Sequence, residues 1–163
     1  MDELTHLDEQ GRARMVNIGA KEITHRVCVA RGEVRMQAET LARIVDGDTP
    51  KGDVLAAARL AGIQASKRTH EWIPLAHPLP LDAVEIKLTA DASGRALCVE
   101  ARAEAHWRTG VEMEAMVAVA AAGLTVYDMC KAIDREMSVE GVRLVSKSGG
   151  KSGDFARSGE SRL

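Results

Sequence analysis

An aspartate and a lysine near the end of an apolar segment are the residues of this sequence best suited to proton transfer. Asp128 and Lys131 lie three positions apart, so a helix places both on one face. The preceding segment, 115–126, is nearly all apolar, which indicates a helix that is not mainly exposed to solvent. A partly buried Asp–Lys pair has coupled, shifted pKa values and suits acid–base chemistry. The alternative is an exposed ion pair without a functional role.

A histidine in a proline-rich loop is a second candidate. His77 stands in the sequence Ile-Pro-Leu-Ala-His-Pro, between two prolines whose fixed φ angles restrict the backbone. An imidazole held in this way suits proton transfer or contact with a phosphate. The alternative is a turn histidine that hydrogen-bonds a neighbouring carbonyl group.

Two glutamates form a third candidate group. Glu112 and Glu114 lie at the expected start of the helix that ends near Asp128. Thr109 and Glu112 have the spacing of a capping box, which would explain Glu112 without a catalytic role. Glu114 could likewise be a first-turn carboxylate that the helix dipole stabilises.

The spacing of these groups restricts how they could act. Glu114 and Asp128 are 14 positions apart, which is about 21 Å along one continuous helix. They cannot both contact one reacting centre within a single chain. Either only one group is catalytic, or the substrate is long, or two chains bring opposite helix ends together. An alanine-rich helix favours the third arrangement, because its surplus apolar surface needs a partner.

A glycine-rich segment, 146–154, ends like a P-loop but does not match that motif. Val145 stands where the motif requires glycine, and too few residues follow for a strand–helix–strand unit. The segment still offers free backbone N–H groups beside Lys147, which favours an anion-binding loop. A flexible basic tail is the alternative.

The overall charge excludes some classes of partner. The net charge of −2, from 22 basic and 24 acidic residues, provides no basic field for nucleic acid. The aromatic content of 2% argues against a stacking surface for single strands. An anion would need a local cluster of lysines, for which Lys51 and Lys67, near the two ends of one expected helix, are further candidates.

The cysteines and the apolar segments indicate the compartment. The three cysteines and five histidines lack metal-ligand spacing, so we expect reduced thiols and no metal site. We find no secretory signal and no apolar run of the ~20 residues needed to cross a bilayer. We therefore expect a cytoplasmic protein without membrane contact.

Hydrophobic periodicity predicts the elements that position these residues. It indicates the order β-α-α-β-β-α-β, with strand 23–36, helices 38–45 and 52–72, strands 84–89 and 96–105, helix 111–137 and strand 142–145. Mostly antiparallel strands with helices packed on one face give an α+β fold. We expect one domain over 22–155, with a loosely ordered arm, 1–21, before it and a flexible tail, 156–163, after it.

Several motifs stand together in the order found in a known family. They are Met15-Val-Asn, Lys51-Gly-Asp-Val, Ala57-Ala-Arg-Leu-Ala-Gly-Ile, Lys67-Arg-Thr, Ile73-Pro-Leu-Ala-His-Pro-Leu, Thr109-Gly-Val-Glu-Met-Glu-Ala, Leu124-Thr-Val-Tyr-Asp-Met-Cys-Lys-Ala and Lys147-Ser-Gly-Gly-Lys-Ser-Gly. On these motifs the chain closely resembles the cyclic pyranopterin monophosphate synthase (MoaC) family of molybdenum-cofactor biosynthesis.

The resemblance implies a fold, an assembly and a reaction. The subunit would be ferredoxin-like and assembled as a homohexamer, a trimer of dimers with active sites at the dimer interfaces. The enzyme would be a lyase acting on 3′,8-cyclo-7,8-dihydroguanosine triphosphate, which a radical-SAM cyclase makes from GTP. It would form cyclic pyranopterin monophosphate and release pyrophosphate. No resident cofactor is implied, although Mg²⁺ could accompany the triphosphate.

The resemblance also implies roles for individual residues. Asp128 and Lys131 match the catalytic acid–base pair. The positions that match substrate contacts or the pocket are Leu75, Ala76, His77, Met113, Glu114, Lys51, Lys67, Glu112 and Lys147.

Two positions depart from the family pattern. Ala76 replaces the usual cysteine, and Asn17 replaces the usual aspartate. The substitution at Ala76 leaves two alternatives open, a non-catalytic oligomeric nucleotide-binding module and a degenerate paralogue.

Overall fold

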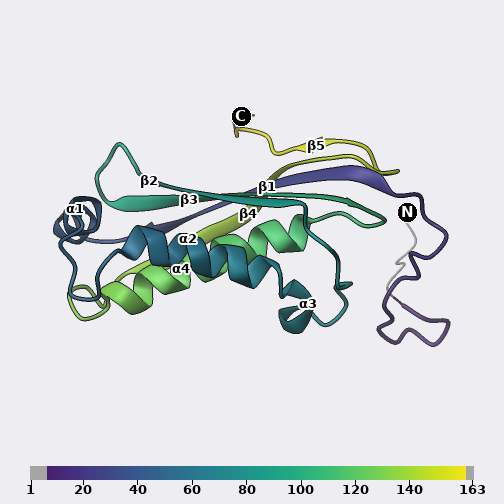
Figure 1. Cartoon of the computed structure of the whole chain (residues 1–163), viewed down its shortest axis with the longest axis horizontal. Helices are drawn as coiled ribbons and strands as arrows, with labels where there is room; N and C mark the ends of the chain where they lie inside the picture. Colours follow the sequence, from purple (N-terminus) through teal and green to yellow (C-terminus); the bar gives the residue numbers. More distant parts are fainter. Residues whose placement is uncertain (1–6, 161–163) are drawn as a thin grey trace.

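One antiparallel sheet carries the fold, with its strands in the order β2-β3-β1-β4-β5 (Figure 1). The computed structural model describes residues 7–160 of the chain. The strands are β1 (Thr24–Arg35), β2 (Ala83–Ala90), β3 (Ala96–Trp107), β4 (Ser138–Ser148) and β5 (Phe155–Ala156). The helices are α1 (Ala38–Asp46), α2 (Val54–Ser66), α3 (Thr69–Trp72) and α4 (Glu112–Cys130). α2 and α4 lie side by side and cover one face of the sheet.

Alternating burial gives the sheet one apolar face. Apart from Leu97 of β3, the buried side chains on this face of the two central strands are small or β-branched, and they include Cys28, Ala30, Val34, Val99, Ala101, Ala103 and Ala105. The polar residues between them, such as Arg31 and Glu100, point to the opposite face, because successive side chains of a strand alternate. The small residues let the helices approach the sheet closely, which explains a core almost without aromatic side chains.

Close approach of α2 to α4 completes the core. A Cβ atom on Gly62 of α2 would lie 2.8 Å from Ile86 Cδ1 and 2.9 Å from the carbonyl oxygen of Ala118 in α4. α4 is long and apolar enough to cross a membrane by length and composition alone. The core helix of a globular domain has the same properties, and more than half of this stretch is buried inside the protein.

The predicted α+β fold, with helices on one face and a ferredoxin-like order, is confirmed. The elements β1-α1-α2-β2-β3-α4-β4 follow one another in the predicted order, and the structure contains α3 and β5 in addition. The last predicted strand, 142–145, is longer than expected and extends over the whole of β4.

The single helix predicted over 52–72 is wrong. The chain forms α2, which ends at Ser66, and the separate short α3, which begins at Thr69. The hydroxyl groups of Ser66 and Thr69 donate hydrogen bonds to the carbonyl oxygens three residues earlier, at 2.8 and 2.9 Å. Arg68 between them has non-helical backbone angles, φ −120° and ψ 21°. These local bonds compete with the regular helical pattern and end it.

The helix predicted over 111–137 is also too long, because α4 ends at Cys130. Asp134 is buried, and its carboxylate accepts hydrogen bonds from the backbone N–H of Gln37 at 2.9 Å and the hydroxyl of Thr40 at 3.2 Å. These bonds attach the segment after α4 to the start of α1, so that the chain turns into β4 instead of continuing as helix.

The two ends of the chain are described in part. Residues 7–21 of the expected arm include a β-bridge between Leu7 and Ala13. In the expected tail, β5 pairs with β4, and Glu160 contacts Arg31 and Arg143. Residues 1–6 of the arm and 161–163 of the tail lie outside the described residues.

The packing at Gly62 can be tested by adding one methyl group. Alanine favours a helix over glycine by about 1 kcal/mol, so an open site would be stabilised by Gly62→Ala. At this site the methyl group meets the Ala118 backbone, and overpacking costs about 1–3 kcal/mol. We expect urea unfolding to show a net loss of about 1 kcal/mol. Glu39→Gln, at an exposed position in the first turn of α1, is the control and should change stability by about 0.5 kcal/mol or less. A Gly62→Ala protein more stable than wild type would contradict this packing.

Candidate functional site

The candidate residues form two groups at opposite ends of α4. The group at the start of α4 surrounds a cavity of about 410 Å³. Its walls come from the loop after α3 and from the first turn of α4, and they include Leu75, Ala76, His77, Glu112, Met113 and Glu114. The structure therefore brings together segments that are about 35 residues apart in the sequence.

His77 ties the N-terminal arm to this cavity. Its Nε2 atom lies 2.8 Å from the carbonyl oxygen of Val16. A carbonyl oxygen only accepts hydrogen bonds, so Nε2 carries the hydrogen and is the donor in this contact. The hydrogen bond from His77 to a carbonyl group, considered above as the alternative, is thus present. The carbonyl group belongs to the distant arm and not to a neighbouring residue.

The arm contributes wall residues that were not among the candidate site residues, although the motif Met15-Val-Asn contains one of them. Val16, Ile18 and Lys21 line the cavity, and no hydrophobic period marks them. Asn17 accepts a hydrogen bond from the backbone N–H of Gly19 at 2.8 Å, which shapes the turn of the arm here.

Glu112 does not act as a helix cap. The N-cap position of α4 is Val111, and no side chain caps this end, so the capping box predicted from Thr109 and Glu112 is wrong. The Glu112 carboxylate instead accepts a hydrogen bond from Lys147 Nζ at 3.1 Å. Lys147 Nζ also lies 3.2 Å from Ser152 Oγ, so this lysine joins the cavity to the glycine-rich segment.

Glu114 is the carboxyl group best suited to carry a proton near neutral pH. Its side chain is buried at the first turn of α4, with a relative exposure of 4%. Burial, with a smaller contribution from the charge of Glu112, raises the pKa of Glu114 to about 7. Glu114 can therefore donate or accept a proton at physiological pH.

Arg26 is a further polar residue at this end that sequence reasoning missed. One guanidinium nitrogen donates to the carbonyl oxygen of Gly149 at 3.3 Å. Its Nε atom is buried and has no hydrogen-bond partner within residues 7–160. Because side chains alternate along β1, Arg26 lies on the same inward-facing side of the strand as Cys28. A charged residue at an inward-facing position was the feature of the sequence that could have identified it.

The second group lies at the far end of α4 and consists of Asp128, Lys131 and Lys51. Lys131 Nζ lies 2.7 Å from Asp128 Oδ1, and Lys51 Nζ lies 3.1 Å from Asp128 Oδ2. Hydrogen bonds from Lys131 and then Lys51 lower the pKa of Asp128, and the hydrogen bond to Asp128 raises the pKa of Lys131. Each group thus keeps the other charged.

The partial burial inferred for the Asp128–Lys131 pair does not hold within one chain. The two side chains are 59% and 51% exposed. The apolar face of α4 points to the sheet and α2, and Asp128 lies on its outer side. A ligand or a second chain would have to cover the pair before proton transfer between its members became easy.

Two other predictions concern lysine and metal binding. Lys67 is the C-cap residue of α2 and is exposed, and no hydrogen bond or ion pair within residues 7–160 involves its side chain. Lys67 is not among the residues that line the cavity at the start of α4. Among the described residues, no cluster of three histidine, cysteine or carboxylate side chains could hold a metal ion.

Comparison with known proteins adds a second line of evidence. The profile of the MoaC family matches residues 15–150. A relative from Roseiflexus sp. (strain RS-1) is 59% identical over 155 residues, which are 95% of this chain and 98% of the relative. A relative from Pelotomaculum thermopropionicum is 56% identical, over 98% of this chain and 94% of its own length. A relative from Cereibacter sphaeroides is 54% identical, over 97% of this chain and 99% of its own length. All three are named cyclic pyranopterin monophosphate synthase.

The burial of Glu114 predicts a pH-dependent effect on stability. The pKa of its carboxyl group is raised from 4.5 to about 7 in the folded chain, so the folded state loses stability as the pH rises from about 4.5 to 7. Glu114→Gln removes this loss. We expect the variant to gain about 2–3 kcal/mol relative to wild type between pH 5 and pH 8, measured by urea unfolding. Glu85→Gln, at an exposed carboxylate, is the control, and a difference that does not change with pH would contradict the buried state of Glu114.

Proposed function

This chain belongs to the MoaC family, and we propose that it is a cyclic pyranopterin monophosphate synthase. In this proposal it is a lyase that converts 3′,8-cyclo-7,8-dihydroguanosine triphosphate into cyclic pyranopterin monophosphate and pyrophosphate. The substrate comes from a radical-SAM GTP cyclase, and the enzyme works in the cytoplasm. The observation that carries the proposal is the cavity lined by His77, Met113 and Glu114, with Lys147 beside it. The chain that forms this cavity is similar to a named synthase over nearly its full length.

The cavity has the groups that binding of this substrate requires. A guanine-derived ring presents N–H donors, which the carboxylates of Glu112 and Glu114 can accept. Phosphates require positive charge, which Lys147 and the backbone N–H groups of the glycine-rich segment supply. When pyrophosphate leaves, these groups stabilise the developing negative charge. Mg²⁺ that arrives with the triphosphate would add to this charge stabilisation.

The reaction also needs proton transfers while the purine-derived ring opens and recloses as a pterin. In the proposal, Asp128 and Lys131 carry them, with Lys51 as a further cation beside them. These residues lie about 21 Å from Glu114 along α4, too far for one chain to use both ends at one ligand. We therefore propose that each active site is shared between two chains.

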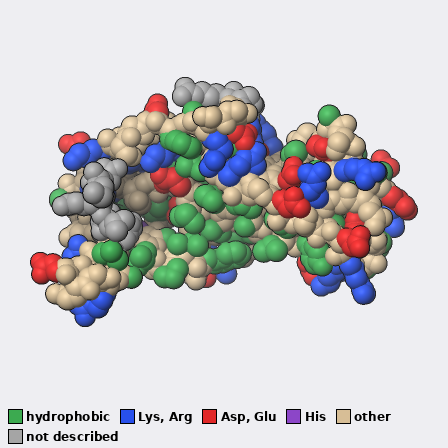
Figure 2. All heavy atoms as spheres, turned by 180° about the vertical axis from the view of Figure 1, so that it is seen from behind, with side chains coloured by type: hydrophobic (Ala, Val, Ile, Leu, Met, Phe, Trp, Pro, Cys, Tyr) green, Lys and Arg blue, Asp and Glu red, His purple; other side chains and the backbone are tan. Residues whose placement is uncertain are grey.

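The surface of the helix layer supports a shared site. Hydrophobic side chains gather over this layer in Figure 2. Among the large hydrophobic residues of the helices, Leu60 of α2, Trp72 of α3 and Leu124 of α4 are exposed. A hollow of about 480 Å³ between α2 and α4 is lined by Trp72, Leu124 and Asp128. A second copy related by a two-fold axis would cover this apolar surface and bring its own α4 in the opposite direction. Three such dimers form the proposed hexamer.

Full-length similarity to synthases favours catalysis over a nucleotide-binding module or a degenerate paralogue. Ala76 lines the cavity, and its backbone N–H bonds the carbonyl oxygen of Ile73 at 3.0 Å, so the loop is formed without a cysteine side chain.

Pyrophosphate release tests the proposed reaction. We expect the wild type to release pyrophosphate from the cyclic nucleotide, and Asp128→Asn to reduce turnover about a hundredfold or more while nucleotide binding changes little. Asp48→Asn, at an exposed carboxylate in a surface ion pair, is the control and should keep full turnover. A wild-type protein without turnover, or an active Asp128→Asn variant, would contradict the proposal.

Mixing two inactive variants tests whether the sites are shared. Lys131→Ala and His77→Ala alter opposite ends of α4, so a mixed dimer contains one site with both changes and one intact site. After dissociation and random reassembly we expect recovery of about a quarter of the wild-type activity. Two variants of the same end, Lys131→Ala and Asp128→Asn, should not complement each other. No recovery in the first mixture, despite proven exchange of subunits, would rule out sharing.

A further inference from the structure

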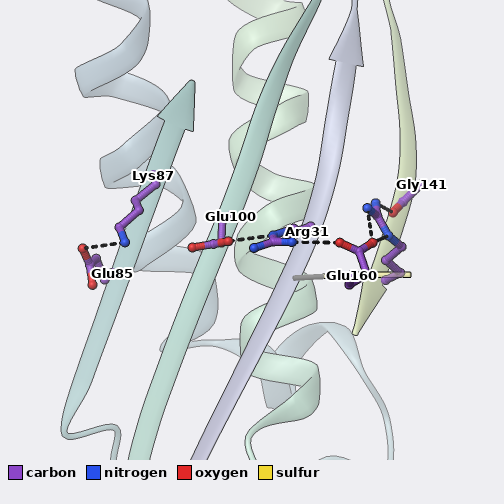
Figure 3. Close-up of polar contacts among 7 residues, drawn as sticks. Arg31, Glu85, Lys87, Glu100, Gly141 and Glu160 are labelled. Carbon is purple, nitrogen blue, oxygen red and sulfur yellow. Dashed lines mark hydrogen bonds and ion pairs between the residues drawn. The ribbon is translucent and has the colours of Figure 1, made fainter. Parts of the chain in front are cut away.

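A row of ion pairs crosses the open face of the sheet, away from the helices (Figure 3). Arg31 of β1 lies at its centre, with its Nε atom 2.7 Å from Glu100 of β3 and a terminal nitrogen 2.8 Å from Glu160. Arg143 of β4 contacts the other carboxylate oxygen of Glu160. Glu160 and Glu100 are only 14% and 15% exposed, so these are not ordinary surface pairs.

Glu160 attaches the last described segment of the chain to the sheet. Only two residue pairs join β5 to β4, Ser146 with Ala156 and Lys147 with Phe155. Beyond them, Arg157 donates from its backbone N–H to Val145 and from its side chain to Leu144. So short a strand is marginal on its own. The two arginines that bind Glu160 therefore provide a second point of attachment.

The charge of Glu160 is maintained in this position. Its partial burial opposes ionisation, but the hydrogen bonds from Arg31 and Arg143 outweigh that effect and lower the pKa of Glu160. The carboxylate is therefore ionised at neutral pH and forms charge-assisted hydrogen bonds with both arginines, which are stronger than neutral ones.

The attached segment ends the glycine-rich loop, residues 149–154. Gly149 and Gly150 have positive φ angles, and the Gly149 N–H lies 3.3 Å from Asp154 Oδ1. From this loop Ser152 contacts Lys147, which in turn contacts Glu112 in the cavity wall. One end of the loop is thus fixed by β4. Within residues 7–160, the other end is fixed by β5 and the residues up to Glu160.

We propose that Glu160 is a positioning residue, which holds residues 155–160 on the sheet through Arg31 and Arg143 and so keeps the loop 149–154 ordered beside Lys147 for phosphate binding. The proposal rests on the proposed function, in which this loop and Lys147 bind the phosphates of the substrate. A loop that is ordered before binding loses less conformational entropy when the phosphates arrive. Release of the segment should therefore weaken binding and leave the proton-transfer groups at the other end of α4 unaffected.

Glu160→Gln tests the proposal, because it keeps the shape of the side chain and removes its charge. Glu85→Gln is the matched control, at an exposed carboxylate on the same face of the sheet, 3.9 Å from Lys87 (Figure 3). In the ligand-free protein we expect the rate of amide hydrogen exchange in 149–157 to rise about tenfold in Glu160→Gln. A hydrogen bond to a charged group contributes enough free energy to change an opening equilibrium by about that factor or more. Exchange in α4 should stay as in the wild type, and Glu85→Gln should change neither region.

Two further measurements separate this role from a general loss of stability. We expect the Kd for pyrophosphate and the KM for the triphosphate to rise about tenfold in Glu160→Gln, with kcat within about twofold of wild type. Arg143→Gln should have a similar effect, and the double variant should be little worse than either single one. Unchanged loop exchange, unchanged pyrophosphate affinity, or a fall in kcat at constant KM would overturn the proposal.

The exchange and pyrophosphate experiments need no turnover, so they also distinguish the two proposals. A wild type that binds pyrophosphate but does not convert the cyclic nucleotide would contradict the proposed function alone. Normal turnover with no effect of Glu160→Gln would contradict the positioning role alone.

Discussion

α4 is one uninterrupted helix from Glu112 to Cys130, and its length separates the polar groups of this chain into two sets. The carboxylates and His77 lie at its first turn, and Asp128, Lys131 and Lys51 lie at its last. A straight helix cannot bring them closer than about 21 Å. Since the proposed reaction needs ring binding, phosphate binding and proton transfer at one ligand, this separation is the reason that we propose a second chain at each site.

The two sets differ in electrostatics as well as in position. Glu114 is buried and has a pKa near neutrality, so it can exchange a proton within the single chain. Asp128 and Lys131 are half exposed and stabilise each other in their charged forms. Covering that pair with an apolar surface would remove water from it and reduce the stability of the charged forms. Assembly would then change the chemistry of the pair as well as complete the binding site.

Much of the fold could be predicted from the sequence, because side-chain alternation in β1 and β3 and the apolar length of α4 are strong signals. The errors arose where side chains bond to the backbone. Ser66 and Thr69 end a helix that its apolar pattern would continue, and the buried Asp134 turns the chain after Cys130. The bonds of Ser66 and Thr69 are local, but the hydrophobic period does not reveal them, whereas the bonds of Asp134 depend on which segments meet in space.

The site was predictable in its motifs but less so in its contacts. The residues about His77 and Glu114 meet in one cavity, whereas Lys67 does not line it. The contacts of Val16 and Glu160 become visible only in the structure, because their partners lie 61 and 129 residues away. The pairing of Glu112 with Lys147, in place of a helix cap, is of the same kind.

The most direct test of the shared site is a structure of the assembled protein with the cyclic nucleotide bound to the slow Asp128→Asn variant. We expect one ligand to contact Glu114 and Lys147 of one chain and Lys131 of a second copy. A ligand whose contacts all come from a single chain, with Lys131 of every copy left in solvent, would contradict this account.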